Sequence, residues 1–382
     1  EPFQKFRRET AKVVSYMVKE FELRKNADQM KRASVAKTGE LNMNKVFSYK
    51  FNDDIFKKMT IVPDGKSHGL VMFLDWSGSM SGHLENTMKQ LITLVMFCKK
   101  VNIPFDVYAF TSESPESYTK RDIKTGDIMM KPFHLLNIFS SRMSAVDFNY
   151  AANVMVEVSC SRYSYCRLFS MGGTPLNEAL VWCYQNLGKF IKNNNIEKTT
   201  FITLTDGEGG QLYGNNNSRC LDETRNDTVD GKWKRIKQRH FIKDEVTQKT
   251  YELKRDSTIQ TEAILRMIKD RYNVSTVGFY ICRNHRRDLG SVVRANIPDY
   301  NGNVDSLIES WRKDFRTNSF ASVKNTGRDE LFLIPQTSTK IVEGELEVDA
   351  TAKAAGDAIE AVFAHQGGEN AYSLHQELQE VA

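Results

Sequence analysis

The chain contains 382 residues, of which 40% are hydrophobic and 26% are charged. These values are ordinary for a globular protein and argue against wholesale disorder, and no stretch approaches the roughly 20 apolar residues that a membrane-spanning helix requires. The net charge of +5, from 53 basic and 48 acidic residues, is too small over this length to indicate a nucleic-acid-binding protein.

Charge is distributed unevenly, and the two ends of the chain have opposite signs. Residues 1–68 contain 15 basic and 9 acidic side chains, a net of +6, whereas residues 340–382 contain 2 basic and 9 acidic ones, a net of −7. We interpret residues 1–44 as a basic helical arm and residues 339–382 as an acidic helical tail. Solvated helix faces explain both charge clusters most simply, and attraction between the two ends or to separate partners is the alternative.

A helix is predicted over residues 3–38, because apolar residues recur at helical spacing from Phe3 to Leu23 with Lys and Arg between them. Extended segments are expected at 46–51, 55–56 and 60–62, and a turn at 63–66.

From residue 69 onward, apolar runs alternate with helical patterns of ten or more residues. Strands are predicted at 69–74, 105–110, 134–139, 199–205, 274–282 and 330–334. Helices are predicted at 83–100, 145–158, 175–193, 258–271, 286–295, 304–316, 350–364 and 370–380. Residues 207–235 are polar and rich in Gly and Asn, which predicts a surface loop or insertion, and a small hairpin is expected across 241–253.

This alternation predicts an α/β fold with a doubly wound, mostly parallel sheet flanked by helices, of the Rossmann-like kind. The predicted domain spans residues 45–338, with the loop and hairpin inserted near 207–255. In such sheets a ligand binds beyond the carboxyl ends of the strands, at the point where the strand order reverses. The polar residues that follow the predicted strands are therefore the first candidates for a functional site.

Three polar clusters lie at predicted strand-to-helix or loop-to-helix junctions. They are Asp75-Trp-Ser77-Gly-Ser79, Gly172-Gly173-Thr174-Pro175 and Thr205-Asp206-Gly207. Each has a structural alternative, since Asp and Ser favour helix N-caps, Gly-Gly-Thr-Pro suits a capped tight turn, and Thr-Asp-Gly suits a turn that closes a strand. All three together, in this order at one predicted sheet edge, favour a shared binding site.

The chemistry of these clusters suits a hard cation. Mg²⁺ takes about six oxygen ligands, and carboxylates and hydroxyls supply them. Ser77 and Ser79, two residues apart in an extended turn, can face the same side, and Gly78 allows the backbone to come close. With only two carboxylates among the ligands, such a metal keeps the capacity to accept one more carboxylate from a partner.

These motifs resemble the metal-ion-dependent adhesion site of von Willebrand factor A domains. The residues that carry the resemblance are DWSGSM at 75–80, GGTPL at 172–176 and TDGEGG at 205–210. The resemblance implies a protein-binding module with a Mg²⁺ site, Mn²⁺ being the alternative ion. It implies as metal ligands Asp75, Ser77, Ser79, Thr174 and Asp206.

The flanking residues resemble more narrowly the A domain of the cobaltochelatase accessory subunit, in versions carried by large tailed phages. The similarity lies in HGLVMFLDWSGSM and the FKKM and VPDGK stretches before it. It implies an adaptor or accessory subunit for an AAA+ ATPase of the MoxR or cobaltochelatase kind. A chelatase subunit that inserts cobalt or magnesium into a tetrapyrrole is one alternative, although the acidic low-complexity segment of that subunit is absent. A virion structural or adhesion protein is the other alternative.

No catalytic residue is predicted within the chain itself. Residues 64–67 read Asp-Gly-Lys-Ser but lack the first glycine of a P-loop, and no G-x-S-x-G or H-E-x-x-H motif occurs. Any ATPase is therefore expected to be the partner. The basic run at 283–287 is a candidate for phosphate or carboxylate binding, with a solvated loop as the alternative.

The six cysteines include no CxxC pair, and three of them, Cys98, Cys183 and Cys282, fall within apolar segments. This pattern predicts reduced, mostly buried thiols in a cytoplasmic protein, or in the host cytoplasm for a phage protein.

Overall fold

The computed structural model describes most of the predicted domain. The described residues are 2–32, 34–36, 59–61, 67–112, 128–160, 169–214, 224–229, 232–237, 239–282, 286–297, 302–318, 320–323 and 326–335. The extended segments predicted at 46–56, the turn at 63–66 and the acidic tail at 339–382 lie outside these ranges.

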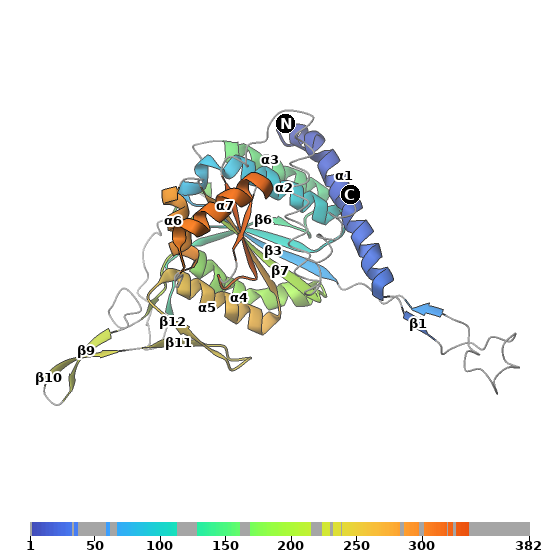
Figure 1. Ribbon diagram of the computed structural model, residues 1–382. Helices are drawn as coiled ribbons and strands as arrows, with labels where there is room; N and C mark the ends of the chain where they lie inside the picture. The colour runs from blue at the N-terminus through green and yellow to red at the C-terminus, as the bar shows by residue number, and fades with distance from the viewer. Residues whose placement is uncertain are drawn as a thin grey trace, which may run out of the picture.

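A seven-stranded sheet forms the centre of the fold, with helices packed around it (Figure 1). Its strands in spatial order are β14 (Ala321–Val323), β15 (Glu330–Pro335), β13 (Ser275–Cys282), β7 (Lys198–Thr205), β3 (His68–Asp75), β4 (Phe105–Thr111) and β6 (His134–Ser140). The five inner strands run parallel, and the two edge strands, β14 and β6, pair antiparallel with their neighbours.

The strand order confirms the predicted doubly wound fold. Numbered along the chain, β6, β4, β3, β7, β13 and β15 lie in the order 3-2-1-4-5-6, which is the order of Rossmann-like sheets. The chain leaves β3 toward one edge and returns to β7 to build toward the other. The strand order therefore reverses between β3 and β7.

Helices cover both faces of the sheet. One face packs against α2 (Leu84–Lys100) and α3 (Ala145–Cys160), and the other against α4 (Leu176–Asn193) and α5 (Ser257–Tyr272). Two further helices, α6 (Arg286–Asn296) and α7 (Val304–Asn318), cover the side of the sheet formed by β13, β14 and β15. All six were predicted from apolar periodicity, and the structure confirms them with boundaries shifted by a few residues.

The first helix, α1 (Pro2–Arg32), confirms the helix predicted at 3–38 but ends earlier. Its first half packs against α2 and α3, where Phe3 and Phe6 are buried and the Phe3 ring meets that of Phe148 edge-on at 6.4 Å. Further along, Leu23 is 54% exposed. The amino-terminal half of this helix is therefore part of the domain core.

Four short strand pairs lie outside the main sheet. They are β1 (Ser34–Ala36) with β2 (Met59–Ile61), β5 (Ile128–Met129) with β8 (Tyr213–Gly214), β9 (Thr224–Val229) with β10 (Lys232–Lys237), and β11 (His240–Lys243) with β12 (Thr250–Leu253). The last pair is the predicted hairpin. The second half of the surface loop or insertion predicted at 207–235 contains two strands that were not predicted, β9 and β10, which pair antiparallel as a hairpin (Figure 1).

The β11–β12 hairpin is anchored by a buried carboxylate, that of Asp244. It accepts hydrogen bonds from Tyr184 Oη at 2.5 Å and Thr247 Oγ1 at 2.7 Å, and it pairs with Arg271 Nη1 at 3.2 Å. Burial raises the pKa of Asp244, but the bonds from Tyr184, Thr247 and two backbone amides outweigh it and hold that pKa well below its usual value. The hairpin is thus fixed to α4 and α5.

Candidate functional site

The predicted site residues lie where the strand order reverses. Asp75 is the last residue of β3 and Thr205 is the last residue of β7, and these two strands are neighbours in parallel register. Side chains at the two carboxyl ends therefore meet at one edge of the sheet, which is where ligands bind in doubly wound folds.

Asp75 is completely buried and only partly hydrogen-bonded. Its Oδ2 atom accepts from Thr205 Oγ1 at 2.7 Å, whereas its Oδ1 atom has no hydrogen-bond partner. Burial raises the pKa of Asp75 to about 7, and the nearby carboxylate of Asp206 adds to the rise, although the hydroxyls of Thr205, Ser77 and Thr174 lower it. The hydroxyls of Ser77 and Thr174 lie close to the Asp75 carboxylate, but neither forms a hydrogen bond of ordinary geometry to Oδ1.

A chain of short contacts joins Ser77, Ser79 and Asp206. The two serine oxygens are 3.0 Å apart, and Ser79 Oγ donates to Asp206 Oδ1 at 2.7 Å. Burial raises the pKa of Asp206, while the bond from Ser79 and the nearby charge of His83 lower it. Ser77 is the N-cap of the short 3-10 helix η2 (Gly78–Gly82), yet its side chain makes no capping hydrogen bond. A helix-capping hydrogen bond is therefore not the role of the Ser77 side chain.

The loop with Thr174 is held against the first cluster by backbone contacts. Gly78 N donates to Gly172 O at 2.9 Å, and Ser112 N donates to Gly173 O at 3.2 Å. A Cβ atom on Gly172 would lie 1.6 Å from the carbonyl oxygen of Ser112, so the close approach requires glycine. The second predicted cluster is thus fixed beside the first.

Thr174 itself lies between the other two clusters. Its hydroxyl is near enough to Asp75 to lower the pKa of that carboxyl, and its carbonyl oxygen accepts from Gly210 N at 3.0 Å. A Cβ atom on Gly207 would lie 3.5 Å from the threonine Oγ1 atom. The structure therefore brings all five predicted ligand residues together. Pro175, predicted as the first residue of the following helix, is its N-cap instead.

Two further residues of the same predicted clusters support the site, although neither was predicted to be a ligand. Thr205 hydrogen-bonds Asp75 and also accepts from Gly207 N at 3.1 Å. Trp76 is 1% exposed and its Nε1 atom donates to Phe169 O at 3.0 Å, which links the first cluster to the segment that leads into Gly172. Their sequence signal was their position, since each is adjacent to a predicted ligand.

The residues present fit a hard cation. Two carboxylates and three hydroxyls offer oxygen ligands only, the donor type that Mg²⁺ selects. The unpartnered Oδ1 atom of the buried Asp75 is the kind of group that a bound ion would satisfy. No three His, Cys, Asp or Glu side chains gather within the described ranges, so this set depends on its hydroxyls.

The cysteines and the basic run at 283–287 are the remaining candidate residues from the sequence. Cys98, Cys183 and Cys282 are buried free thiols, as predicted, and Cys160 is exposed. The first three residues of the basic run at 283–287 lie outside the described part of the chain, and the last two begin α6. Among the helices described, none is long and apolar enough to cross a bilayer.

No protein-family model matches the sequence, and no curated protein matches it. Among solved structures, the chain is similar to the pilus adhesin SpaC from Lactobacillus rhamnosus GG in its open conformation, at 12% identity and a TM-score of 0.37, over 77% of this chain and 30% of SpaC. It is also similar to the vWF domain of the type V pili tip protein Mfa5 from Porphyromonas gingivalis, at 10% identity and a TM-score of 0.36, over 78% of this chain and 97% of that domain.

The chain thus spans less than a third of SpaC. The strand order and the packing of the helices on both faces of the sheet define the fold.

Proposed function

We propose that this protein is a Mg²⁺-dependent protein-binding module. The observation that carries the proposal is the convergence of four oxygen-bearing side chains on the buried carboxylate of Asp75, whose Oδ1 atom lacks a partner. The residues that would hold the ion are Asp75, Ser77, Ser79, Thr174 and Asp206. Mn²⁺ is the alternative ion for the same oxygen set.

A bound divalent cation would supply positive charge that attracts a carboxylate from a partner protein. The chain's own residues limit how far that charge is neutralised, because three of the five ligand side chains are uncharged hydroxyls. Thr205 orients Asp75 through its hydrogen bond to Oδ2. Trp76 holds the segment that leads into Gly172 through its hydrogen bond to Phe169 O. Together they keep the ligand side chains in place before an ion arrives, which lowers the entropic cost of binding.

The partner that we propose is a cytoplasmic AAA+ ATPase, for which the protein acts as an adaptor. This part of the proposal is supported by the sequence resemblance to accessory subunits of such ATPases. An acidic side chain on the ATPase, or on the substrate that it remodels, is the group that the site would bind.

The test uses Asp206→Asn with Glu208→Gln as its matched control, since Glu208 is an exposed acid two positions further along the same loop. Isothermal titration calorimetry measures Mg²⁺ affinity, and pull-down with a purified AAA+ ATPase of the MoxR or cobaltochelatase kind measures capture with Mg²⁺ or EDTA. We expect Asp206→Asn to weaken both and Glu208→Gln to weaken neither. Unchanged Mg²⁺ affinity in Asp206→Asn would overturn the metal site, and capture that is insensitive to EDTA would overturn the adaptor mechanism.

A further inference from the structure

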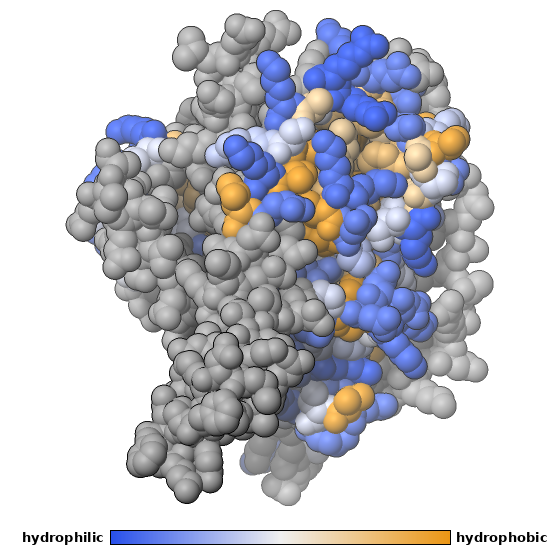
Figure 2. Space-filling view, turned by 90° about the vertical axis from the view of Figure 1, so that its right-hand side faces the viewer, coloured by the Kyte–Doolittle hydropathy of each residue, from blue (hydrophilic) through white to orange (hydrophobic). Residues whose placement is uncertain are grey.

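A cleft of about 240 Å³ lies between the carboxyl-terminal half of α4 and strands β3 and β4. It adjoins the early residues of these strands, Val71 and Asp106, and so lies toward the opposite end of β3 from Asp75. Figure 2 views the side of the molecule from which β3 enters the sheet, where hydrophobic side chains gather between hydrophilic ones. None of the five proposed metal ligands lines the cleft.

A buried acidic residue, Asp106 of β4, lines the cleft. Along β4, Phe105 and Val107 belong to the core under α2 and α3, so Asp106 faces the α4 side of the sheet. It is 4% exposed, its Oδ1 atom has no hydrogen-bond partner, and its Oδ2 atom pairs with Arg142 Nη2 at 3.5 Å. Burial raises the pKa of Asp106, while the hydroxyls of Ser140 and Tyr108 and the charge of Arg142 lower it. Because a buried carboxylate oxygen without a partner is costly, a ligand that donates a hydrogen bond to Oδ1 would be favoured here.

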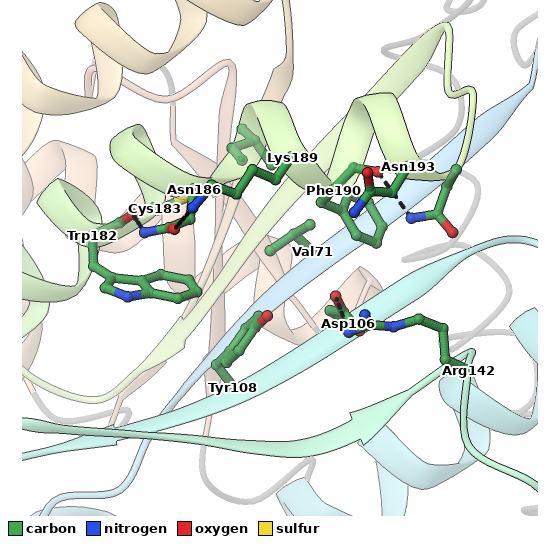
Figure 3. Close-up of a pocket in the computed structure, with 12 residues that line it drawn as sticks. Val71, Asp106, Tyr108, Arg142, Trp182, Cys183, Asn186, Lys189, Phe190 and Asn193 are labelled. Atoms are coloured by element: carbon green, nitrogen blue, oxygen red, sulfur yellow. Dashed lines mark hydrogen bonds and ion pairs between the residues drawn. The ribbon is translucent and has the colours of Figure 1, made fainter.

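Aromatic rings form one wall of the cleft. Tyr108 and Trp182 meet edge-on with ring centroids 5.1 Å apart, and Phe190 lies about one turn further along α4 than Asn186, which hydrogen-bonds back to Trp182. Figure 3 shows Tyr108 and Asp106 on the strand side, facing residues from α4. Such a wall suits a flat ring, because aromatic surfaces gain from stacked or edge-on contact.

The rim of the cleft is basic. Arg142 and Lys189 line it against the single carboxylate of Asp106, so the titratable side chains sum to a net charge of +1. The Arg142 side chain is 70% exposed but its guanidinium pairs with Asp106, whereas Lys189 Nζ, among the described residues, donates only to the amide oxygen of Asn186, at 3.3 Å. Lys189 is thus the cation that an anionic group at the mouth of the cleft can reach.

From this juxtaposition we infer that the cleft binds a nucleoside monophosphate. Its base would donate an N–H or amino group to Asp106 Oδ1, its ring would contact Tyr108 and Trp182, and its phosphate would meet Lys189. The ligand class follows from three requirements together: a donor at the closed end, a flat ring in the middle and an anion at the open end.

The test measures binding of AMP, GMP, CMP and UMP to the whole chain by isothermal titration calorimetry. Adenosine and ribose 5-phosphate serve as probes for the ring alone and the phosphate alone. We expect at least one monophosphate to bind with a Kd of about 1 mM or tighter, and more tightly than either fragment. Failure of all four to bind would overturn the inference, as would equal binding of ribose 5-phosphate, which would show an anion site only.

Variants then assign the contacts for the tightest monophosphate. Asp106→Asn should weaken binding about tenfold or more, the effect of losing a buried hydrogen bond to a charged group. Lys189→Ala should weaken it about two- to fivefold, and Lys192→Ala, an exposed lysine of the same helix outside the cleft, should have no effect. Thermal unfolding checks that each variant is folded. Wild-type affinity in Asp106→Asn would overturn the assignment of the closed end, whatever the outcome at the metal site.

Discussion

Replacing Asp75 by Asn should change stability in opposite directions with and without Mg²⁺. In the absence of divalent cations the carboxylate is buried with one oxygen unpartnered, and a buried group of this kind costs about 1–3 kcal/mol. The asparagine oxygen can still accept from Thr205, while its amide group faces the hydroxyls of Ser77 and Thr174. We therefore expect Asp75→Asn to be more stable than wild type in EDTA by about 1–3 kcal/mol.

With Mg²⁺ the order should reverse. An ion that binds only the folded state stabilises it by about 4.1 kcal/mol at a concentration of about 1,000 times its Kd. Wild type gains this increment, and Asp75→Asn loses most of it because one of two ligand charges is gone. At about 2–4 °C per kcal/mol for a domain of this size, the two melting curves should exchange order between EDTA and saturating Mg²⁺.

The assay is thermal unfolding followed by circular dichroism in both conditions. Glu178→Gln is the matched control, because Glu178 is also fully buried with both carboxylate oxygens unpartnered but is not among the proposed ligands. It should raise Tm equally in EDTA and Mg²⁺. If Mg²⁺ raises the Tm of Asp75→Asn as much as that of wild type, the assignment of Asp75 as a metal ligand is refuted.

Three further predictions concern residues that position the site or the hairpin beside it. Trp76→Phe removes the hydrogen bond to Phe169 O and should weaken Mg²⁺ affinity by up to about tenfold, measured by titration calorimetry, with an unchanged affinity excluding a positioning role. Gly172→Ala should lower stability by about 1–3 kcal/mol, since its Cβ atom would overlap the Ser112 carbonyl oxygen, and urea unfolding that matches wild type would contradict this close contact. Asp244→Asn should lower the free energy of unfolding at pH 7 by about 1–3 kcal/mol. Because the folded-state pKa of Asp244 is depressed, the difference from wild type should persist above about pH 4 and shrink as the pH falls below it. A difference that stays constant with pH would contradict the charged hydrogen-bond network.

The central sheet could be predicted from the sequence because its strands are buried on both faces. Gly69–Leu74 reads as a continuous apolar run, and every residue from 69 to 75 is buried in the structure. The direction of β6 could not be read from its own residues, since hydropathy does not depend on strand direction. The evidence was in the preceding segment, which lacks the helical pattern that a parallel crossover usually requires.

The β9–β10 hairpin was missed for a different reason. Its strands, TRNDTV and KWKRIK, contain few apolar residues and carry no alternating pattern that predicts a buried face. The useful signal was the Asp230-Gly231 dipeptide between them, a sequence that favours two-residue hairpin turns. Turn chemistry was therefore more informative than hydropathy in this polar insertion.

Asp75 and Asp106 show what separates a site that the sequence can predict from one that it cannot. Both are buried acids on adjacent strands, and each has one oxygen without a partner. Asp75 could be predicted because its companions are local or lie in short motifs at strand ends, so that parallel pairing alone brings them together. Asp106 acquires its surroundings from a helix 76 or more residues away and from Arg142, two residues after the end of β6, where no motif marks the contact. A site built from element interiors depends on packing, and only the three-dimensional structure reveals it.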